Sequence, residues 1–113
     1  MTARNMLTTA PPYAVEDALR RLGSNLRTAR IRRKLTIREV AEKIGTGPRP
    51  VSDAEKGKPS TGVAVYVALL WTYRLLNRLD DVADPALDKE GLALALDSEP
   101  VRARRSNLLD DDF

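Results

Sequence analysis

The four residues Thr-Ile-Arg-Glu at positions 36–39 constrain this sequence more than any other feature. A hydroxyl at the first position and a glutamate three residues later can each bond the other's backbone amide, which starts a helix. Apolar residues then recur at helical spacing as far as Gly45, which can close the helix in the left-handed conformation. A second helix is predicted from Pro48 to Lys56, because proline is tolerated in a first turn. The chain should therefore contain two short helices joined by a tight turn.

Three further helices with apolar residues at helical spacing are expected around this pair, at residues 13–33, 62–73 and 75–82. Gly23 should weaken the first of them slightly. The turn at residues 58–62 is predicted to end in a hydroxyl cap for the next helix.

The ends of the chain carry weaker patterns. Asp84 and Pro85 predict an N-cap followed by a first helical position. The sequence GLALAL at 91–96 allows a short helix or a strand, and we favour the helix. Residues 1–12 are expected to be a disordered arm, residues 13–83 the folded domain, and residues 84–113 a partly disordered extension.

Composition excludes several classes of function. The 113 residues include no cysteine and no histidine, which removes disulfides, thiolate and imidazole catalysis and the usual zinc ligands. We therefore expect no enzyme, no metal and no cofactor. No apolar run is long enough to span a membrane, and the first residues lack a signal-peptide core, so a cytoplasmic protein without a membrane partner is expected.

The charges are distributed unevenly along the chain. Residues 1–58 carry 13 Lys and Arg against 6 Asp and Glu, a net charge of +7, whereas residues 59–113 carry 6 against 10, a net charge of −4. A basic half that contains the paired helices points to the phosphate backbone of DNA as partner. The alternative is a charged surface that serves solubility alone.

The sequences LTIREVAEKIG and VSDAEKGKPS resemble the helix-turn-helix of the Cro and lambda-repressor superfamily, also called the XRE type. The resemblance extends over about residues 15–80 and implies an all-α, lambda-repressor-like bundle of about five helices that binds DNA. Its scaffold positions are Ala41, Gly45 and Val51. Two positions depart from the family pattern: Gly47 replaces a Ser or Thr N-cap, and Pro50 replaces a residue that often contacts DNA. A further departure is Arg74, where most relatives have glycine, so the break between the last two helices was expected to be shifted or partly absent.

The resemblance implies that the second helix of the pair reads bases. Arg49 is assigned as the main reader because its fork matches guanine O6 and N7, with Ser52 and Asp53 beside it. Asp53 has three open alternatives: accepting from cytosine N4, orienting Arg49, or pairing with Lys56. The other predicted DNA-binding residues, mainly phosphate contacts, are Thr36, Arg38, Thr46, Pro48, Lys56, Lys58, Arg27 and Arg30.

One recognition helix makes too few contacts for tight specific binding, so a homodimer on a palindromic operator is expected. The helix at 62–73 is apolar on nearly all sides, more than a single buried stripe requires. We assign its inner stripe to Val63, Val67, Leu70 and Trp71. We assign the dimer interface to Val65, Tyr66, Leu69 and Trp71.

Residues 71–96 resemble the end of HipB-like antitoxins, the repressors encoded beside HipA-type kinases. This resemblance implies that a HipA-like toxin kinase is the partner, held through residues 85–113 while the pair represses its own operon. The alternatives are a stand-alone XRE-type regulator and a helix-turn-helix fold that contacts only proteins.

Overall fold

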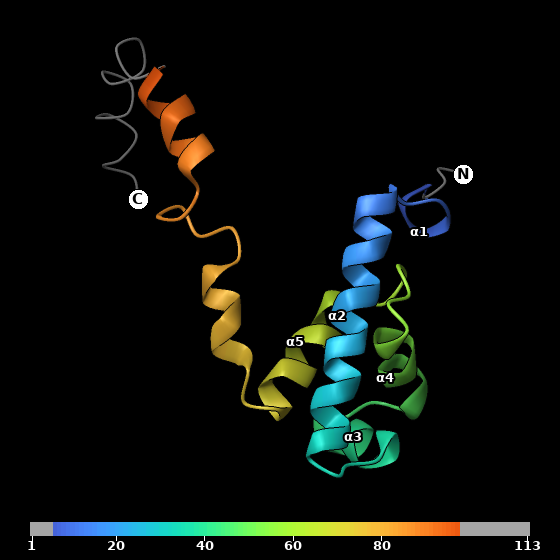
Figure 1. Ribbon diagram of the computed structural model, residues 1–113. Helices are drawn as coiled ribbons and strands as arrows, with labels where there is room; N and C mark the ends of the chain where they lie inside the picture. Colours follow the sequence, from blue (N-terminus) through green and yellow to red (C-terminus); the bar gives the residue numbers. More distant parts are fainter. Residues whose placement is uncertain (1–5, 98–113) are drawn as a thin grey trace. The chain divides into compact units, whose positions relative to one another are not determined.

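A computed structural model describes residues 6–97 of the chain (Figure 1). The chain divides into two compact units, Met1–Asn77 and Arg78–Phe113, which are described separately. Every regular element in the described range is helical, which confirms the all-α prediction. The elements are α1 (Met6–Thr9), α2 (Tyr13–Arg32), α3 (Ile37–Ile44), α4 (Pro48–Glu55), α5 (Val63–Thr72) and the 3-10 helix η1 (Leu76–Asp81).

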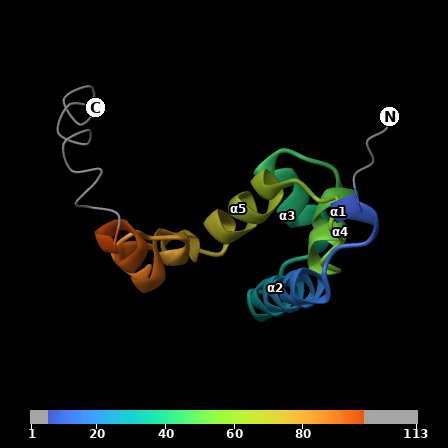
Figure 2. The ribbon, with the colours of Figure 1, turned by 90° about the horizontal axis from the view of Figure 1, so that it is seen from above.

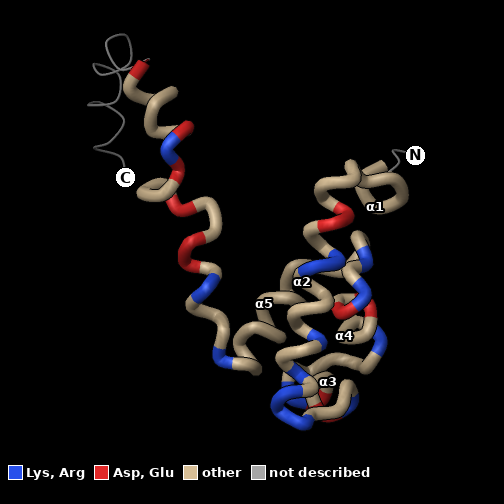
Figure 3. Tube along the Cα trace, viewed as in Figure 1, with Lys and Arg blue, Asp and Glu red and all other residues tan. Residues whose placement is uncertain are grey.

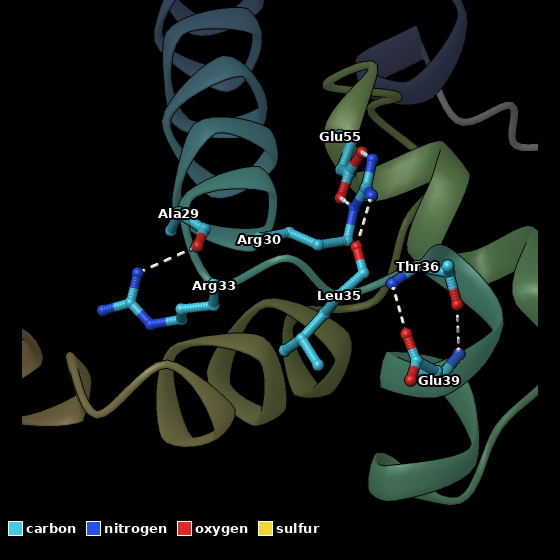
Figure 4. A network of polar contacts seen from close by, with 7 residues as sticks. All are labelled: Ala29, Arg30, Arg33, Leu35, Thr36, Glu39 and Glu55. Atoms are coloured by element: carbon cyan, nitrogen blue, oxygen red, sulfur yellow. Dashed lines mark hydrogen bonds and ion pairs between the residues drawn. The ribbon is translucent and has the colours of Figure 1, made fainter.

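The start of α3 is the predicted reciprocal cap. The Thr36 hydroxyl accepts a bond from the Glu39 amide at 3.0 Å, and the Thr36 amide donates to Glu39 Oε1 at 2.8 Å (Figure 4). Gly45 ends the helix at a φ of 81°, in the left-handed region that favours glycine. Both boundaries of α3 are therefore fixed by residues close together in the sequence.

Helix α4 begins at Pro48, as predicted, and Glu55 is its last residue, so Lys56 is the C-cap instead of a helical residue. Its N-cap is Gly47, which is extended and supplies no side-chain bond. The helix packs against α2, α3 and α5 (Figures 1 and 2). The core of the first unit consists of Leu26, Ala29, Val40, Ala41, Val51, Ala54, Tyr66, Leu69 and Tyr73.

Gly23 allows α2 and α4 to approach closely. A Cβ atom there would lie 2.5 Å from the Ala54 carbonyl oxygen and 2.6 Å from that of Glu55. Gly57, at a φ of 71°, is similar, since its Cβ would lie 2.7 Å from the backbone of Arg20. The sequence predicted only a slight weakening of α2 by Gly23; the structure adds that the close contact with α4 depends on the missing side chain.

The inner face of α5 differs from the predicted one. Tyr66 and Leu69 are buried in the core, whereas Val63 is 73% exposed and Trp71 55% exposed. The assignment of Tyr66 and Leu69 to a dimer interface is therefore wrong, since each is covered by its own chain. A helix that is apolar on nearly every side gives no pattern from which to choose the buried face.

The ends of α5 also differ from prediction. Gly62 is its N-cap and supplies no side-chain bond, so the hydroxyl cap is absent. At the other end Arg74 adopts a φ of 61°, and the Leu75 amide donates to the Leu70 carbonyl at 2.8 Å. The break at Arg74 is therefore complete even without glycine. The predicted helix beyond it is the 3-10 helix η1.

The second unit buries none of its described residues, 78–97. Asp84 Oδ1 accepts from the Ala86 amide at 2.9 Å and so stabilises a turn, not a helix start. The helix begins after Asp88, whose Oδ1 accepts from the Gly91 amide at 3.0 Å, and it includes residues 89–97. The helical alternative for GLALAL is therefore confirmed, but its predicted N-cap is wrong.

Within the predicted N-terminal arm, the described part contains one helical turn, α1, with no buried residue. The first five residues of that arm and residues 98–113 of the predicted C-terminal extension lie outside the described residues.

Candidate nucleic-acid interface

The outer face of α4 lines an open concavity of about 710 Å³, which we call the α4 concavity. It combines one residue of α3 with residues of α4 and of the turn that follows. These are Ile37, Pro48, Arg49, Ser52, Asp53, Lys56 and Lys58. Six of the seven were predicted from the sequence to contact DNA, so the structure brings most of that set onto one surface.

The packing of α4 explains why these side chains face outward. Val51 and Ala54, three residues apart, are both fully buried against the neighbouring helices. Arg49 and Lys56 lie on the opposite side and are exposed. Neither side chain makes a hydrogen bond or an ion pair with the described part of the chain, so both cationic groups are available to a partner.

Asp53 is the single acidic residue that lines the α4 concavity. Its carboxylate lies 3.9 Å from Lys58 Nζ, and its carbonyl oxygen accepts from the Lys58 amide at 3.0 Å. Of the alternatives open for Asp53, neither the pairing with Lys56 nor a contact with Arg49 is present among the described residues, where Lys58 is the partner. With both side chains partly exposed, the ion pair is weak enough to be exchanged for another partner.

Arg30, a predicted phosphate contact, instead forms a buried ion pair. Its Nε and Nη2 donate to the two carboxylate oxygens of Glu55 at 2.7 and 3.0 Å, and Nη1 donates to the Leu35 carbonyl at 2.9 Å (Figure 4). The side chains of Arg30 and Glu55 are only 12% and 5% exposed. The bond to Glu55 raises the pKa of Arg30, although burial opposes it. Its guanidinium is therefore occupied in holding α2 to α4 and is not a DNA contact.

Arg33 has a structural role that the sequence did not reveal. Its guanidinium donates to the carbonyl oxygens of Ala29 and Tyr73, both at 2.9 Å, and lies 5.5 Å from the centre of the Tyr73 ring. It therefore joins the ends of α2 and α5. Contacts between residues 40 positions apart leave no local pattern, so no signal in the sequence identifies this one.

Besides Arg30, four predicted contacts lie outside the α4 concavity. Arg27 and Arg38 are exposed on α2 and α3, and Thr46 is half-buried in the turn between α3 and α4. The Thr36 hydroxyl already accepts the capping bond from Glu39. These four positions remain predictions for contacts with the DNA backbone.

The charge difference between the halves of the sequence recurs in the two units (Figure 3). Residues 6–77 carry 13 Lys and Arg against 6 Asp and Glu, a net charge of +7. Residues 78–97 carry 2 against 6, a net charge of −4. A net positive charge on the unit that contains α4 favours association with a polyanion.

Residues 26–70, which include α3 and α4, match the family model described as helix-turn-helix. This segment is a helix-turn-helix domain. The match includes α3, α4 and their turn, and it supports the XRE-type family and a DNA-binding regulator of transcription. No curated protein and no solved structure matches the chain.

No helix at residues 6–97 is long and apolar enough to cross a membrane. The same range contains no group of three or more acidic, histidine or cysteine side chains that could hold a metal ion.

Proposed function

We propose that the protein is a sequence-specific transcriptional repressor that binds a palindromic operator as a homodimer. The observation that carries this proposal is the α4 concavity, where six predicted DNA contacts meet on one face of the helix-turn-helix domain. A surface that serves solubility alone would not require these residues to line one hollow.

Within that surface the roles divide between bases and phosphates. Arg49 is exposed near the start of α4, and its side chain has no partner among the described residues. The first turn of a recognition helix is the part that meets base edges. The guanidinium fork of Arg49 fits guanine O6 and N7. Lys56 and Lys58 lie at the other end of α4 and would contact phosphates as point charges.

The two prolines of α4 reduce the number of backbone amides that could bind phosphate. Pro48 and Pro50 have no amide hydrogen, so two of the donors that a helix start offers to phosphate are absent. Gly47 adds no side-chain donor. Phosphate binding at α4 therefore depends on the Lys and Arg side chains and should be strongly salt-dependent.

The homodimer proposal rests on the apolar residues that α5 leaves exposed, Val63 and Trp71. Val65, two residues after Val63, is partly buried against the core. Two copies on one operator would place their α4 helices in major grooves about one helical turn apart, which doubles the base contacts.

The experiment for this proposal is selection of binding sites from random duplex DNA, followed by titration of the selected site at several salt concentrations. A pseudo-palindromic site whose affinity falls steeply with salt is expected. An affinity that does not change between low and physiological salt would contradict the proposal. Equal affinity for all sequences would instead favour a helix-turn-helix domain without sequence-specific function.

We further propose that the repressor is a HipB-like antitoxin whose partner is a HipA-like kinase. This rests on the resemblance of residues 71–96, supported by the exposed leucines of the helix at 89–97. Co-expression with the adjacent gene product tests it. The kinase should co-purify with the full chain and be lost from a chain ending at Asp84. If no partner co-purifies, a stand-alone regulator is the better description.

A further inference from the structure

A second hollow of about 430 Å³ lies around the single tryptophan of the chain, and we call it the Trp71 concavity. Its lining is Lys43, Trp71, Thr72, Arg74, Leu76 and Asn77. None of these residues lines the α4 concavity. A partner in the Trp71 concavity would therefore leave the proposed DNA surface open.

The lining of this hollow combines an apolar floor with positive charge. Trp71 is 55% exposed, and Leu76, the first residue of η1, lines the same hollow. Lys43 and Arg74 are the charged residues of the lining, and no acidic residue is among them. Arg74 also has a positive φ of 61°, a strained conformation that is retained at a surface position.

These charges argue against a dimer in which the Trp71 concavities of two copies face each other. In a two-fold interface the same patch faces itself, so Lys43 and Arg74 of both copies would come together without a compensating carboxylate. The concavity instead fits an acidic segment that carries apolar side chains.

The chain itself contains such a segment, the helix at residues 89–97. Leu92 and Leu96 are four residues apart, so they lie on one side of this helix, and they are 58% and 55% exposed. The neighbouring residues Asp88, Glu90 and Asp97 outweigh one lysine. No described residue of this unit is buried, so residues 78–97 form no core that covers Leu92 and Leu96.

We propose that the helix at 89–97 of one copy docks in the Trp71 concavity of a second copy, and that the second copy returns the contact. Leu92 and Leu96 would cover Trp71 and Leu76, while the net charge of −4 on residues 78–97 attracts this unit to Lys43 and Arg74. Each dimer then contains the contact twice, which brings two modest surfaces toward the area that a stable dimer buries.

This inference rests on the proposed homodimer and names the surface that forms it. The leucines concerned are those that the antitoxin proposal gives to a kinase. Kinase binding and dimer exchange would therefore compete, and the purified protein alone is the material for the test.

Two variants separate an exchanged dimer from a direct interface between α5 helices. The first, Trp71→Ala, damages the concavity and leaves the helix at 89–97 intact. The second, Leu92→Ala with Leu96→Ala, damages the helix surface and leaves the concavity intact, and alanine favours the helical conformation. Each alone should weaken dimerisation at least about tenfold, measured by sedimentation.

An equimolar mixture of the two variants should restore dimers, because one helix and one concavity remain undamaged. Emission in the mixture comes from Trp71 of the leucine variant alone, so docking should shift its spectrum to shorter wavelength. Ile31→Ala is the matched control, because Ile31 is an apolar residue of α2 that is 47% exposed and lies outside the concavity. Circular dichroism checks that each variant retains its helices.

The outcomes distinguish the two levels of the argument. A wild-type protein that is monomeric at micromolar concentration overturns both the homodimer and the exchange. A wild-type dimer that persists in both variants, or a mixture that stays as monomeric as its parts, overturns the exchange and leaves the homodimer standing.

Discussion

The inner face of α4, which packs on α2, and its outer face, which lines the α4 concavity, both contain charged side chains. On the inner face Glu55 is 5% exposed and is held by two bonds from Arg30. On the outer face Arg49 is exposed and has no partner in the described part of the chain. A charged side chain therefore stabilises the fold on the buried face of α4 and is available to DNA on the exposed face. Burial makes the difference.

The largest effect should follow from breaking the inner ion pair. Arg30→Met leaves the Glu55 carboxylate buried without its cation, which should cost about 3 to 5 kcal/mol of unfolding free energy. Urea denaturation measures it. Arg27→Met, at an exposed arginine three residues earlier on α2, is the control and should leave stability unchanged.

Replacing both partners should recover most of that loss, because Arg30→Met with Glu55→Met leaves no buried charge unpaired. If Arg30→Met were as stable as the wild type and instead bound DNA more weakly, the distinction between the two faces would fail.

Gly23→Ala should have the next largest effect. The added Cβ meets backbone carbonyl oxygens of α4, which cannot rotate away, so the helices must separate at a cost of about 3 kcal/mol. The free energy of unfolding again measures it. Ser24→Ala, at the exposed next position, makes the control, and equal stability of the two variants would contradict the close approach.

On the outer face, Arg49→Ala should weaken operator binding by about 1 to 3 kcal/mol and relax preference at one base pair per half-site. The free energy of unfolding should not change. Lys56→Ala should instead weaken binding to all sequences alike and reduce the salt slope by about 1. Titrations on the selected operator and on single-base variants measure both. A uniform loss for Arg49→Ala would make it a phosphate contact.

Buried Tyr73 should make the free energy of unfolding depend on pH. Burial, with the nearby Glu55 carboxylate, raises the pKa of Tyr73 from its ordinary value of 10.0 to about 12. The protonated form is therefore favoured by folding, so its stabilisation is complete below pH 10 and is lost as pH rises toward 12. The loss should reach about 2 kcal/mol.

Denaturation across this pH range measures the effect, and Tyr73→Phe should remove most of it. The pKa of Tyr66 is also raised by burial, so a smaller decline should remain. The Tyr73 hydroxyl is buried and has no hydrogen-bond partner in the described residues, so its removal should not destabilise the fold at neutral pH. A full decline in Tyr73→Phe would assign the titration to another group.

The smallest effect concerns Asp53, whose carboxylate lies near Lys58 on the outer face. Asp53→Asn should release Lys58 to phosphate and raise affinity for random duplex DNA by on the order of 0.5 kcal/mol. Ser52→Ala, the adjacent neutral position, controls for loss of a polar group. Weaker operator binding with a changed base preference would show instead that Asp53 accepts from cytosine.

Much of the helix-turn-helix could be predicted because its signals are local. The cap of α3 joins residues three positions apart, and Gly45 acts through its own φ. The outward set of α4 follows from the helical period once Val51 and Ala54 are taken as the buried positions. Proline at the start of α4 constrains only its own turn. Each of these features depends on neighbours within one or two turns of helix.

Local signals are therefore enough to place the starts of α3 and α4, the end of α3 and the outward residues of α4. The pairing of Arg30 with Glu55, the close approach that Gly23 allows and the burial of Tyr66 and Leu69 emerge only when the helices pack. The reason is that these outcomes depend on helices brought together from distant positions. An arginine is compatible with an exposed or a paired state, and an apolar helix with several buried faces, until the opposing surface is known.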